Sequence, residues 1–412
     1  MRLAFEKVAV VGLGYVGLPT AAILASHGVQ VIGVDVDARA VDTINQGRAH
    51  IVEPALDAVL QAVVSSGKLH ATATPQPADA FIIAVPTPLC GGQQPDISYI
   101  EQAARDIAPV LAKGNLVILE STSPVGTTRR VSQLLAEARP ELTFPHQSQD
   151  PDIHVAHCPE RVLPGRVLRE LVENDRIIGG LSRQCANEAR AFYRMFARGV
   201  CHMTDAETAE MAKLTENTFR DVNIALANEL SIICEKHGIN VWDMIELANH
   251  HPRVNILQPG PGVGGHCIAV DPWFIAASAP DDAKLIRTAR QVNDAKPMQI
   301  VERVGELASR FRDPVIACLG LAYKADVDDL RESPALHIAR ELATREGLRV
   351  VAVEPYIDRL PDTLENIELM ELDEAIVQAD IVVLLVNHRF FLDFDREALS
   401  EKVVIDTRGV WR

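Results

Sequence analysis

The sequence has little that would build a disulfide framework or a zinc site. Its 412 residues include seven cysteines, an odd number, and no two of them form a C-x-x-C pair. No group of cysteines and histidines has the spacing of a zinc finger, and His250 and His251 do not stand at metal-ligand spacing from other ligands. We therefore expect a reduced, cytoplasmic chain without structural disulfides and without a metal.

The sequence also lacks an excess of positive charge. Its 40 Lys and Arg residues are outnumbered by 56 Asp and Glu residues, which gives a formal net charge of −16 at pH 7. This charge argues against non-specific binding to nucleic acid and against attraction to an anionic membrane. It does not exclude an anionic ligand, because basic side chains and helix N-termini can bind phosphate inside an acidic protein.

One apolar segment near the start of the chain fits two interpretations. Residues 8–25 are almost uncharged and follow Arg2 and Lys7, as in a signal peptide or a membrane span. The segment also contains three glycines and Pro19, and Glu6 precedes it. We favour a strand and a helix over a targeting segment.

Length and hydrophobic pattern indicate an α/β protein with more than one domain. A chain of 412 residues, 48% of them hydrophobic, is too long for one ordinary domain. In the first half, short apolar runs alternate with helical stretches such as 100–111, which favours a parallel sheet covered on both faces. The strands expected there are 8–11, 31–34, 81–85, 117–119 and 154–157. Four more strand-like runs after residue 314 indicate a second α/β unit.

The middle of the chain has a helical pattern. Residues 207–234 contain neither Gly nor Pro and have apolar side chains at helical spacing, and Gly238 follows as a stop signal. A helix of about thirty residues is roughly 45 Å long, and we expect it to lie between domains. We predict two Rossmann-like, doubly wound domains joined by a central helical domain, with the divisions 1–205, 206–300 and 301–412.

A dinucleotide-binding pattern follows the first expected strand. In G-L-G-Y-V-G, the residues Gly12, Gly14 and Gly17 allow a tight turn, a close approach to a pyrophosphate, and close helix–strand packing. The second strand ends at Asp35, whose carboxylate suits a ribose 2′-hydroxyl and would repel a 2′-phosphate. We therefore expect NAD, while the nearby Arg39 leaves NADP open. The alternative is a glycine turn without a ligand.

Two polar loops follow other expected strands. Thr87 lies in V-P-T-P, and Thr122 and Thr127 lie in S-T-S-P-V-G-T. Open α/β sheets bind ligands at the carboxyl ends of their strands, so both loops are candidates for the cofactor site. Thr127 also fits the N-cap of the following helix.

Cys267 lies in G-V-G-G-H-C-I-A-V-D, a run poorly suited to a packed core. A thiolate can hold an aldehyde as a thiohemiacetal, from which loss of a hydride leaves a thioester for hydrolysis. The glycines would let the substrate and backbone N–H groups come close. Combined with a nicotinamide cofactor, this thiol predicts oxidation of an alcohol to a carboxylate. The alternative is a buried structural thiol.

Polar residues occur on the expected long helix. Lys213 and Asn217 are four residues apart and therefore share one face. A desolvated lysine can act as an acid–base group or stabilise an alkoxide, whereas the alternative is a solvated surface lysine. The helix also places amides and one arginine among apolar neighbours, and buried amides need hydrogen-bond partners: Asn217, Arg220, Asn223 and Asn228.

A second group of charged residues follows the strand at 154–157. Glu160 can activate a hydrolytic water, and Arg161 can bind a phosphate or a sugar, as can Arg253 in H-H-P-R-V-N. The alternative for each is an ordinary surface ion pair.

These motifs, in this order, resemble the UDP-glucose/GDP-mannose dehydrogenase family from about Lys7 to the end of the chain. Within the family, C-P-E-R-V-L-P-G, A-E-M-A-K-L-T-E-N-T-F-R-D-V-N and H-P-R-V-N-I-L-Q-P-G-P-G-V-G-G-H-C-I-A-V-D-P-W-F are most similar to the members that act on UDP-N-acetyl-D-mannosamine for bacterial surface polysaccharide. The resemblance implies an N-terminal NAD domain, a central domain whose long helix forms a dimer core, and a C-terminal UDP-binding domain. It also implies a four-electron oxidation at C6 of a UDP-sugar with two NAD, by a homodimer or higher homo-oligomer.

The resemblance implies roles by motif match. Cys267 would be the nucleophile, Lys213 the acid–base group or alkoxide stabiliser, and Asn217 and Asp271 would position water or substrate. Glu160 would be the base of the thioester stage, and Thr122 would lie by the nicotinamide. The implied cofactor contacts are Gly12, Gly14, Tyr15, Val16, Gly17, Asp35, Thr87, Thr127 and Arg331. The implied substrate contacts are Arg161, Val162, Lys213, Asn217, Arg220, His251, Arg253 (in relatives from the neighbouring subunit), Gly264 and Lys324.

The chain departs from the UDP-glucose dehydrogenases at one position. Those enzymes typically have a second glutamate four residues after the one that matches Glu160, and this chain has Pro164 there. The difference argues against UDP-glucose as the substrate. UDP-N-acetylglucosamine, UDP-glucose and GDP-mannose stay open as alternatives, as does an NAD-binding regulator that has lost catalysis.

Overall fold

A computed structural model of the protein describes residues 5–163, 165–361 and 364–411. Pro164, the position of the departure noted above, lies outside the described residues. The chain forms two compact units, an N-terminal unit that ends at Thr215 and a C-terminal unit that begins at Glu216. The division falls inside helix α8 (Ala206–Lys236), so the three domain boundaries expected from the sequence stay predictions.

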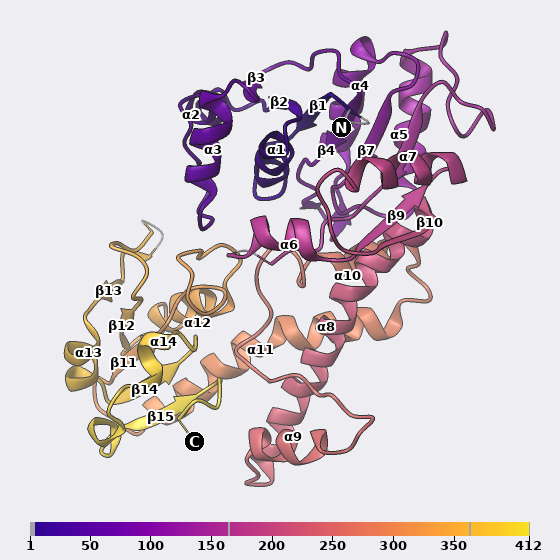
Figure 1. The fold of residues 1–412 in the computed structure, drawn as a ribbon. Coiled ribbons are helices and arrows are strands. Elements are labelled where there is room, and N and C mark those ends of the chain that lie inside the picture. Colours follow the sequence, from indigo (N-terminus) through magenta and orange to yellow (C-terminus); the bar gives the residue numbers. More distant parts are fainter. Residues whose placement is uncertain (1–4, 164, 362–363, 412) are drawn as a thin grey trace. The chain divides into compact units, whose positions relative to one another are not determined.

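The N-terminal unit is built on an eight-stranded sheet of order β10-β9-β8-β7-β4-β1-β2-β3 (Figure 1). The chain starts in the middle, moves outward to β3 and returns to the other side at β4, as in dinucleotide-binding folds. β8 and β9 pair antiparallel, and the other neighbouring pairs are parallel. The strands are β1 (Lys7–Val11), β2 (Gln30–Val34), β3 (Leu69–Thr72), β4 (Ala80–Ile83), β7 (Leu116–Leu119), β8 (His154–His157), β9 (Arg176–Gly180) and β10 (Cys201–Asp205).

Helices connect these strands. They are α1 (Gly17–Ser26), α2 (Ala38–Asn45), α3 (Leu56–Ser65), α4 (Ser98–Ile107), α5 (Thr127–Ala138), α6 (Val167–Glu173) and α7 (Arg183–Tyr193). The helix expected at 100–111 ends earlier, because Pro109 has no N–H to donate, and a 3-10 turn, η1 (Ala108–Val110), follows α4. The short strands β5 (Leu89–Cys90) and β6 (Gln94–Pro95) form a hairpin.

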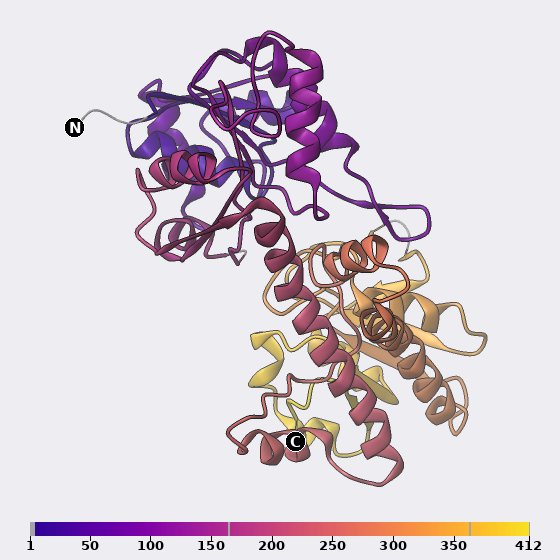
Figure 2. The ribbon, with the colours of Figure 1, turned by 90° about the vertical axis from the view of Figure 1, so that its right-hand side faces the viewer.

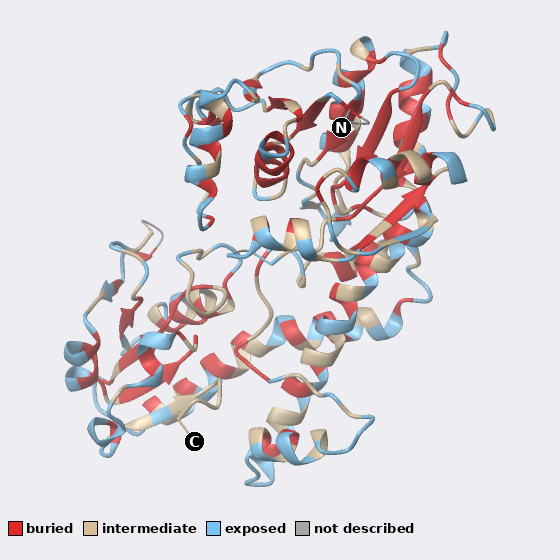
Figure 3. Cartoon of the chain, viewed as in Figure 1, coloured by how far each residue is buried: buried red, intermediate tan, exposed pale blue. Residues whose placement is uncertain are grey.

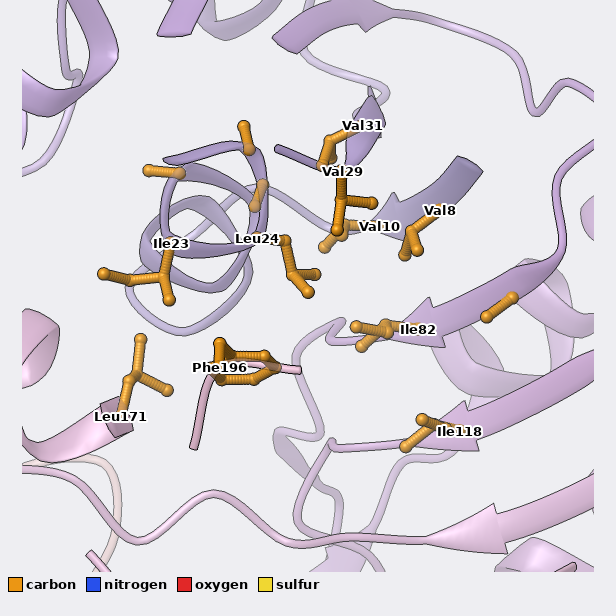
Figure 4. Packing of buried hydrophobic residues seen from close by; sticks show 14 of the residues in the cluster. Val8, Val10, Ile23, Leu24, Val29, Val31, Ile82, Ile118, Leu171 and Phe196 are labelled. Atoms are coloured by element: carbon orange, nitrogen blue, oxygen red, sulfur yellow. The ribbon is translucent and has the colours of Figure 1, made fainter. Parts of the chain in front are cut away.

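Both faces of the large sheet are buried, which explains its continuous apolar strands. Val8 and Val10 of β1 belong to the core cluster that contains α1, whereas Ala9 and Val11 belong to the cluster that contains α4. Figure 4 shows the first cluster, with Leu24 lying near Val10. A strand covered on both faces loses the alternation of apolar and polar residues.

Five of these strands were predicted, with ends within two residues, and β3, β9 and β10 were missed. β3 and β10 are the edges of the sheet and carry exposed polar side chains, so their sequences have no apolar run. Residues 8–25, which also fitted a targeting segment, form β1, a turn and most of α1. None of the described helices combines the length and the apolar character that a membrane crossing requires.

The helix α8 is 31 residues long, close to the expected length, and is continuous (Figure 2). The C-terminal unit adds α9 (Val241–Asn249), α10 (Asp271–Ser278) and α11 (Lys284–Ala308). Its sheet has the order β13-β12-β11-β14-β15 and is parallel throughout. The remaining elements are β11 (Val315–Leu319), α12 (Pro334–Ala343), β12 (Arg349–Val353), β13 (Ile367–Leu369), α13 (Leu372–Gln378), β14 (Ile381–Leu384), α14 (Arg389–Leu392), η3 (Arg396–Leu399) and β15 (Val403–Asp406).

The sequence predicted four of the five strands of this second sheet and missed β13, an edge strand of only three residues. The central strands β11, β12 and β14 are buried, as Figure 3 shows, and their apolar runs made them detectable. The fold class expected from the sequence, two Rossmann-like α/β parts joined by a helical part with one long helix, is therefore confirmed.

Candidate active site

The three glycines between β1 and α1 have three different environments. Gly12 has a φ of 90°, and a Cβ there would lie 2.5 Å from the carbonyl oxygen of Ala84. A Cβ on Gly17 would lie 1.9 Å from the carbonyl oxygen of Gly12, so this residue allows the helix to pack on the turn. A Cβ on Gly14 would meet nothing within 4 Å, which leaves open space where a ligand can approach the backbone.

The N-terminus of α1 and the end of β2 suit a dinucleotide. Val16, the N-cap of α1, makes no side-chain hydrogen bond to the helix, and the turn of Tyr15 and Val16 leads into a helix N-terminus whose partial positive charge suits a phosphate. One oxygen of Asp35 accepts the N–H of Leu13 at 2.8 Å and the other accepts that of Asp37 at 2.9 Å. These bonds hold the carboxylate beside the glycine turn, where it suits a ribose hydroxyl.

The loops after β4 and β7 are joined to each other. The hydroxyl of Thr87 donates to the carbonyl oxygen of Thr122 at 2.7 Å, and that of Ser121 donates to the carbonyl oxygen of Val85 at 2.7 Å. The structure thus brings Thr87 and Thr122 together at the carboxyl edge of the sheet.

The interpretation of Thr127 as an N-cap is wrong. Thr127 is the first residue of α5, Gly126 is its N-cap, and the Thr127 hydroxyl donates to the carbonyl oxygen of Pro124 at 2.6 Å. Glu210 of α8 caps the helix instead, because its carboxylate accepts the N–H groups of Gly126 and Thr128 at 2.6 and 2.7 Å. A partner more than eighty residues away leaves no local signal in the sequence.

Glu160 makes a buried ion pair rather than a surface one. Its Oε2 accepts from the Arg176 guanidinium at 3.2 Å, and its Oε1 accepts the N–H of Arg161 at 2.6 Å. The side chains of Glu160 and Arg176 are 8% and 6% exposed. The adjacent Arg161 donates to the carbonyl oxygen of Asp175 at 3.4 Å. The orientation of the Glu160 carboxylate is therefore fixed from two sides.

A second buried carboxyl accompanies this ion pair. Glu120, directly after β7, accepts from the Tyr193 hydroxyl at 2.6 Å, and the Arg176 guanidinium carbon lies 4.5 Å from the Tyr193 ring centroid. Burial, followed by the negative charge of Glu160, raises the pKa of Glu120 to about 7. Sequence reasoning missed Glu120, Tyr193 and Arg176; only the position of Glu120 at a strand end could have suggested it.

Lys213 is buried, and its interpretation as a solvated surface lysine is wrong. It lies on α8 with a residue exposure of 8%. His157 at the end of β8 is fully buried, and burial together with the positive charge of Lys213 lowers the pKa of His157 to about 3. His157 is therefore neutral near pH 7.

Asn217 and Asp271 form a buried pair. The Asn217 amide nitrogen donates to the Asp271 carboxylate, and the Asn217 amide oxygen accepts from the guanidinium of the exposed Arg220. Asp271 begins α10, and its N–H donates to the carbonyl oxygen of Cys267 at 2.9 Å. The pair is therefore linked directly to the turn that carries the thiol.

Cys267 is exposed, so its interpretation as a buried structural thiol is wrong. The glycines before it pack closely on the segment 323–332: a Cβ on Gly264 would lie 2.4 Å from the carbonyl oxygen of Glu332, and one on Gly265 would lie 2.9 Å from the Tyr323 ring. This segment contains Lys324, whose ammonium lies 5.6 Å from the Tyr323 ring centroid, and Arg331, whose guanidinium is paired with Asp329 at 2.9 and 2.7 Å.

The site residues predicted from the sequence are divided between the two units. The loop after α9 contains His251 and Arg253, both exposed, and the Arg253 N–H donates to the His251 ring at 3.3 Å. The N-terminal unit contains Thr122, Glu160, Arg161, Val162 and Lys213, together with the glycine turn. The C-terminal unit contains Asn217, Arg220, His251, Arg253, Gly264, Cys267, Asp271, Lys324 and Arg331.

The C-terminal unit also contains a cavity of about 310 Å³ that the sequence did not predict. Its lining residues are Ile224, Leu257, Gln258, Pro259, Gly260, Gly262, Asn387 and Arg408. The Arg408 guanidinium donates two hydrogen bonds to the amide oxygen of Asn387, at 3.1 and 3.0 Å. A Cβ on Gly260 would lie 2.4 Å from a nitrogen of this guanidinium. Asn387 and Arg408 follow β14 and β15, so strand ends were the available signal.

Comparison with known proteins agrees with this arrangement. Models of the UDP-glucose/GDP-mannose dehydrogenase family match residues 6–197 (NAD binding domain), 207–295 (central domain) and 317–412 (UDP binding domain). The NDP-N-acetyl-D-galactosaminuronic acid dehydrogenase of Ralstonia nicotianae is 62% identical over 408 residues, 99% of this chain and 96% of the relative. The UDP-N-acetyl-D-mannosamine dehydrogenase of Campylobacter jejuni is 58% identical over 405 residues, 97% and 98% of the two chains.

A solved structure is similar over nearly the whole chain. The UDP-D-ManNAc dehydrogenase of Pyrococcus horikoshii has a TM-score of 0.89 and 42% identity, over 98% of this chain and 96% of that one. The glycine turn with Asp35 fits the NAD that the N-terminal family model names. The chain therefore belongs to the UDP-glucose/GDP-mannose dehydrogenase family and is an NAD-dependent dehydrogenase.

Proposed function

We propose that the protein oxidises the C6 alcohol of UDP-N-acetyl-D-mannosamine to UDP-N-acetyl-D-mannosaminuronate, in four electrons and with two NAD. The observation that carries the proposal is the exposed Cys267, whose turn leads directly into the buried pair of Asp271 and Asn217. Oxidation of an aldehyde to an acid passes through a tetrahedral adduct that carries a hydroxyl group, and an exposed thiol beside fixed polar groups can form such an adduct.

In the first oxidation the alcohol loses a proton and a hydride and becomes an aldehyde. Bound NAD supplies the hydride acceptor in this oxidation and in the next. We assign Lys213 to the acid–base step or to stabilising the alkoxide, because its burial strengthens the effect of its charge. Thr122 lies at the carboxyl edge of the sheet, where the nicotinamide of a bound dinucleotide would lie.

In the second oxidation the Cys267 sulfur adds to the aldehyde carbon, and the carbonyl oxygen takes a proton, which gives a thiohemiacetal. Loss of a hydride from the same carbon, together with loss of the proton from its hydroxyl group, leaves a thioester. Water then attacks this carbon, the carbon–sulfur bond breaks, and the carboxylate and the thiol are released. We assign Glu160 to activating the water, with Arg176 holding its orientation, and Asn217 and Asp271 to positioning water or substrate.

We assign the UDP part of the substrate to the cavity of about 310 Å³ in the C-terminal unit. Two observations support this assignment. Arg408 and Asn387 lie within the range matched by the UDP binding domain, and they stand at the carboxyl ends of strands of a parallel α/β sheet. The half-buried Arg408 guanidinium offers donors suited to ribose or phosphate oxygens.

The identity of the sugar rests on the relatives. Proteins named for UDP-N-acetyl-D-mannosamine are 54–58% identical to this chain, which supports that sugar. A second candidate is the corresponding N-acetylgalactosamine nucleotide, because the 62% identical Ralstonia protein is named for N-acetyl-D-galactosaminuronic acid. The two sugars differ at two ring centres, the acetamido-bearing C2 and the hydroxyl-bearing C4, so a few contacts of the site separate them. We also propose that the product serves bacterial surface polysaccharide synthesis and that the enzyme is cytoplasmic.

We further propose that the protein is a homodimer through α8. Phe219, Leu226 and Ile233 recur every seven residues on one side of this helix and are 59%, 47% and 45% exposed. Large apolar side chains repeated along one face of a helix favour a second helix as their partner.

The experiment that tests the activity is the NADH yield from a limiting amount of each nucleotide sugar. The sugars are UDP-N-acetylmannosamine, UDP-N-acetylgalactosamine, UDP-N-acetylglucosamine, UDP-glucose and GDP-mannose. We expect a yield near two NADH per sugar with the first alone. A yield near one would mean that the reaction stops at the aldehyde and would contradict the role of Cys267. Turnover of another sugar would change the specificity but not the chemistry.

A further inference from the structure

The segment before the glycine turn of Cys267 has no helix or strand, yet asparagine side chains hold it. Asn223 of α8 donates to the carbonyl oxygen of Asn255 at 2.8 Å and accepts the N–H of Leu257 at 2.9 Å. Asn249, the last residue of α9, donates to the carbonyl oxygen of Ile256 at 2.9 Å and accepts the N–H of the same residue at 2.8 Å. Each amide thus bonds the backbone of this segment twice.

A third asparagine holds the end of the same segment. The Asn228 amide oxygen accepts the N–H of Gly260 at 2.9 Å, and its nitrogen donates to the Asn293 amide oxygen at 2.9 Å. Asn293 in turn donates to the Asp221 carboxylate at 2.8 Å. Asn228, Asn293 and Asp221 are at most 1% exposed. Gly260 is therefore tied to a buried polar network between α8 and α11.

Asparagine is suited to this role by its chemistry. Its primary amide carries a donor and an acceptor, as a peptide group does, so it can replace a neighbouring strand for a segment that has none. Asn223 and Asn228 have apolar neighbours in the sequence, and we therefore expect them to need hydrogen-bond partners in a buried site. Those partners are the backbone groups of residues 255–260.

The held segment forms one wall of the cavity described above. Leu257, Gln258, Pro259 and Gly260 line the cavity on one side, and Asn387 and Arg408 line it too. A Cβ on Gly260 would lie 2.4 Å from a terminal nitrogen of the Arg408 guanidinium, so the segment and this side chain are neighbours in the cavity wall. A shift of the segment would therefore change the width of the cavity beside Arg408.

We propose that Asn223, Asn228 and Asn249 are positioning residues of the nucleotide subsite, which hold residues 255–260 in the shape that binds UDP. The proposal rests on the assignment of UDP to this cavity. It places the effect of these amides on the binding of the nucleotide and not on the chemistry at Cys267. None of the three needs to touch the ligand.

The variants Asn223→Asp and Asn249→Asp test this proposal. Each keeps the size and the acceptor but replaces the donor with a carboxylate oxygen that faces a backbone carbonyl oxygen. We expect the dissociation constant for UDP and the KM for the UDP-sugar to rise about tenfold, with kcat and the affinity for NAD changed less than about twofold. Isothermal titration with UDP and with NAD, together with steady-state kinetics, measures these quantities.

The chain offers a matched control. Asn45 of α2 donates to the carbonyl oxygen of Ala71 at 2.9 Å and accepts the N–H of Ala71 at 2.8 Å. It therefore makes the same pair of hydrogen bonds to the backbone as Asn249 does. Asn45→Asp makes the same chemical change in the N-terminal unit. It should lower the thermal midpoint to a similar extent and leave the affinity for UDP unchanged.

The outcomes separate this inference from the proposed function. If Asn223→Asp and Asn249→Asp fold and bind UDP as tightly as the wild type, the inference is wrong. If Arg408→Gln also binds UDP normally, the assignment of the cavity itself fails. Should an aspartate variant not fold, Asn223→Ser, which removes both bonds without adding charge, decides the question by the same titrations.

Discussion

The amide of Asn217 on α8 donates a hydrogen bond to the carboxylate of Asp271 at the start of α10, 54 residues further along the chain. Both side chains are buried, at 0% and 3% exposure, and Arg220 donates to the other side of the same amide. This bond joins the long helix to the turn that carries Cys267. It is therefore one of the contacts that position the thiol.

Exchanging the two partners tests this bond. Asn217→Asp places two carboxylates together in a buried site and should lower the free energy of unfolding by about 3 kcal/mol. The double variant Asn217→Asp/Asp271→Asn restores one donor and one acceptor, so we expect it to recover at least half of that loss. Urea unfolding of the single and double variants measures the coupling. Losses that simply add would show that the two residues do not interact.

The thiol should be required for turnover but not for binding. We expect Cys267→Ser to lower acid production by about a thousandfold or more, because an alcohol is a far weaker nucleophile than a thiolate. Since Cys267 is exposed, binding of UDP and NAD and the thermal midpoint should hardly change. The exposed Cys90 provides the control, as Cys90→Ser should leave turnover unchanged. Normal acid production by Cys267→Ser would refute the covalent role.

Asp35 should affect the affinity for NAD but not the affinity for UDP. The Asp35→Ala variant loses the carboxylate that holds the N–H of Leu13 and that suits the ribose, so the affinity for NAD should fall about tenfold or more. The affinity for UDP should not change. Asp37→Ala, which removes the cap of α2, controls for local stability. An unaltered NAD affinity in Asp35→Ala would count against the cofactor site.

The buried Glu120 should make stability depend on pH. Its pKa is raised from the ordinary 4.5 to about 7, first by burial and then by the charge of Glu160, so the folded protein binds more protons than the unfolded chain between these values. Stability must therefore decrease as pH rises through this interval, by at most about 1.4 kcal/mol per pH unit.

The variant Glu120→Gln isolates this effect. A glutamine keeps an acceptor for the Tyr193 hydroxyl but cannot ionise. We expect the variant to lose less stability than the wild type between pH 5 and pH 8, measured by urea unfolding. Glu137→Gln, at an exposed position on α5, should follow the wild type. Equal pH dependence in Glu120→Gln and the wild type would mean that Glu120 is already ionised at pH 5.

The apolar side of α8 should control assembly. We expect Leu226→Glu to convert a dimer into monomers at micromolar concentration, because it places a charge in the middle of an apolar contact. Leu285→Glu, at another exposed leucine on α11, should leave the mass unchanged. Sedimentation velocity measures both. If the wild-type protein sediments as a monomer, the proposed homodimer is wrong.

Local sequence was sufficient wherever one short segment decides the structure. The turn from Gly12 to Gly17 was predictable, since the restrictions on each glycine come from the adjoining strand and helix. α8 was predictable because an uninterrupted helical period needs no distant partner. Edge strands such as β3 and β13 were not predicted, because they are short and have no continuous apolar run.

The charged network around Glu160 and the cavity of the C-terminal unit came only from the tertiary structure. Glu120 and Arg176 are 56 positions apart in the sequence numbering, and each looks ordinary beside its neighbours in the chain. Likewise, Arg408 meets Gly260 and Asn387 only in the folded chain, where all three line one cavity. The sequence by itself determined the fold class, the cofactor turn and the candidate nucleophile, because those depend on local backbone preference. Which charges are buried together was decided by the packing of distant segments, because desolvation and ion pairing exist only in the folded chain.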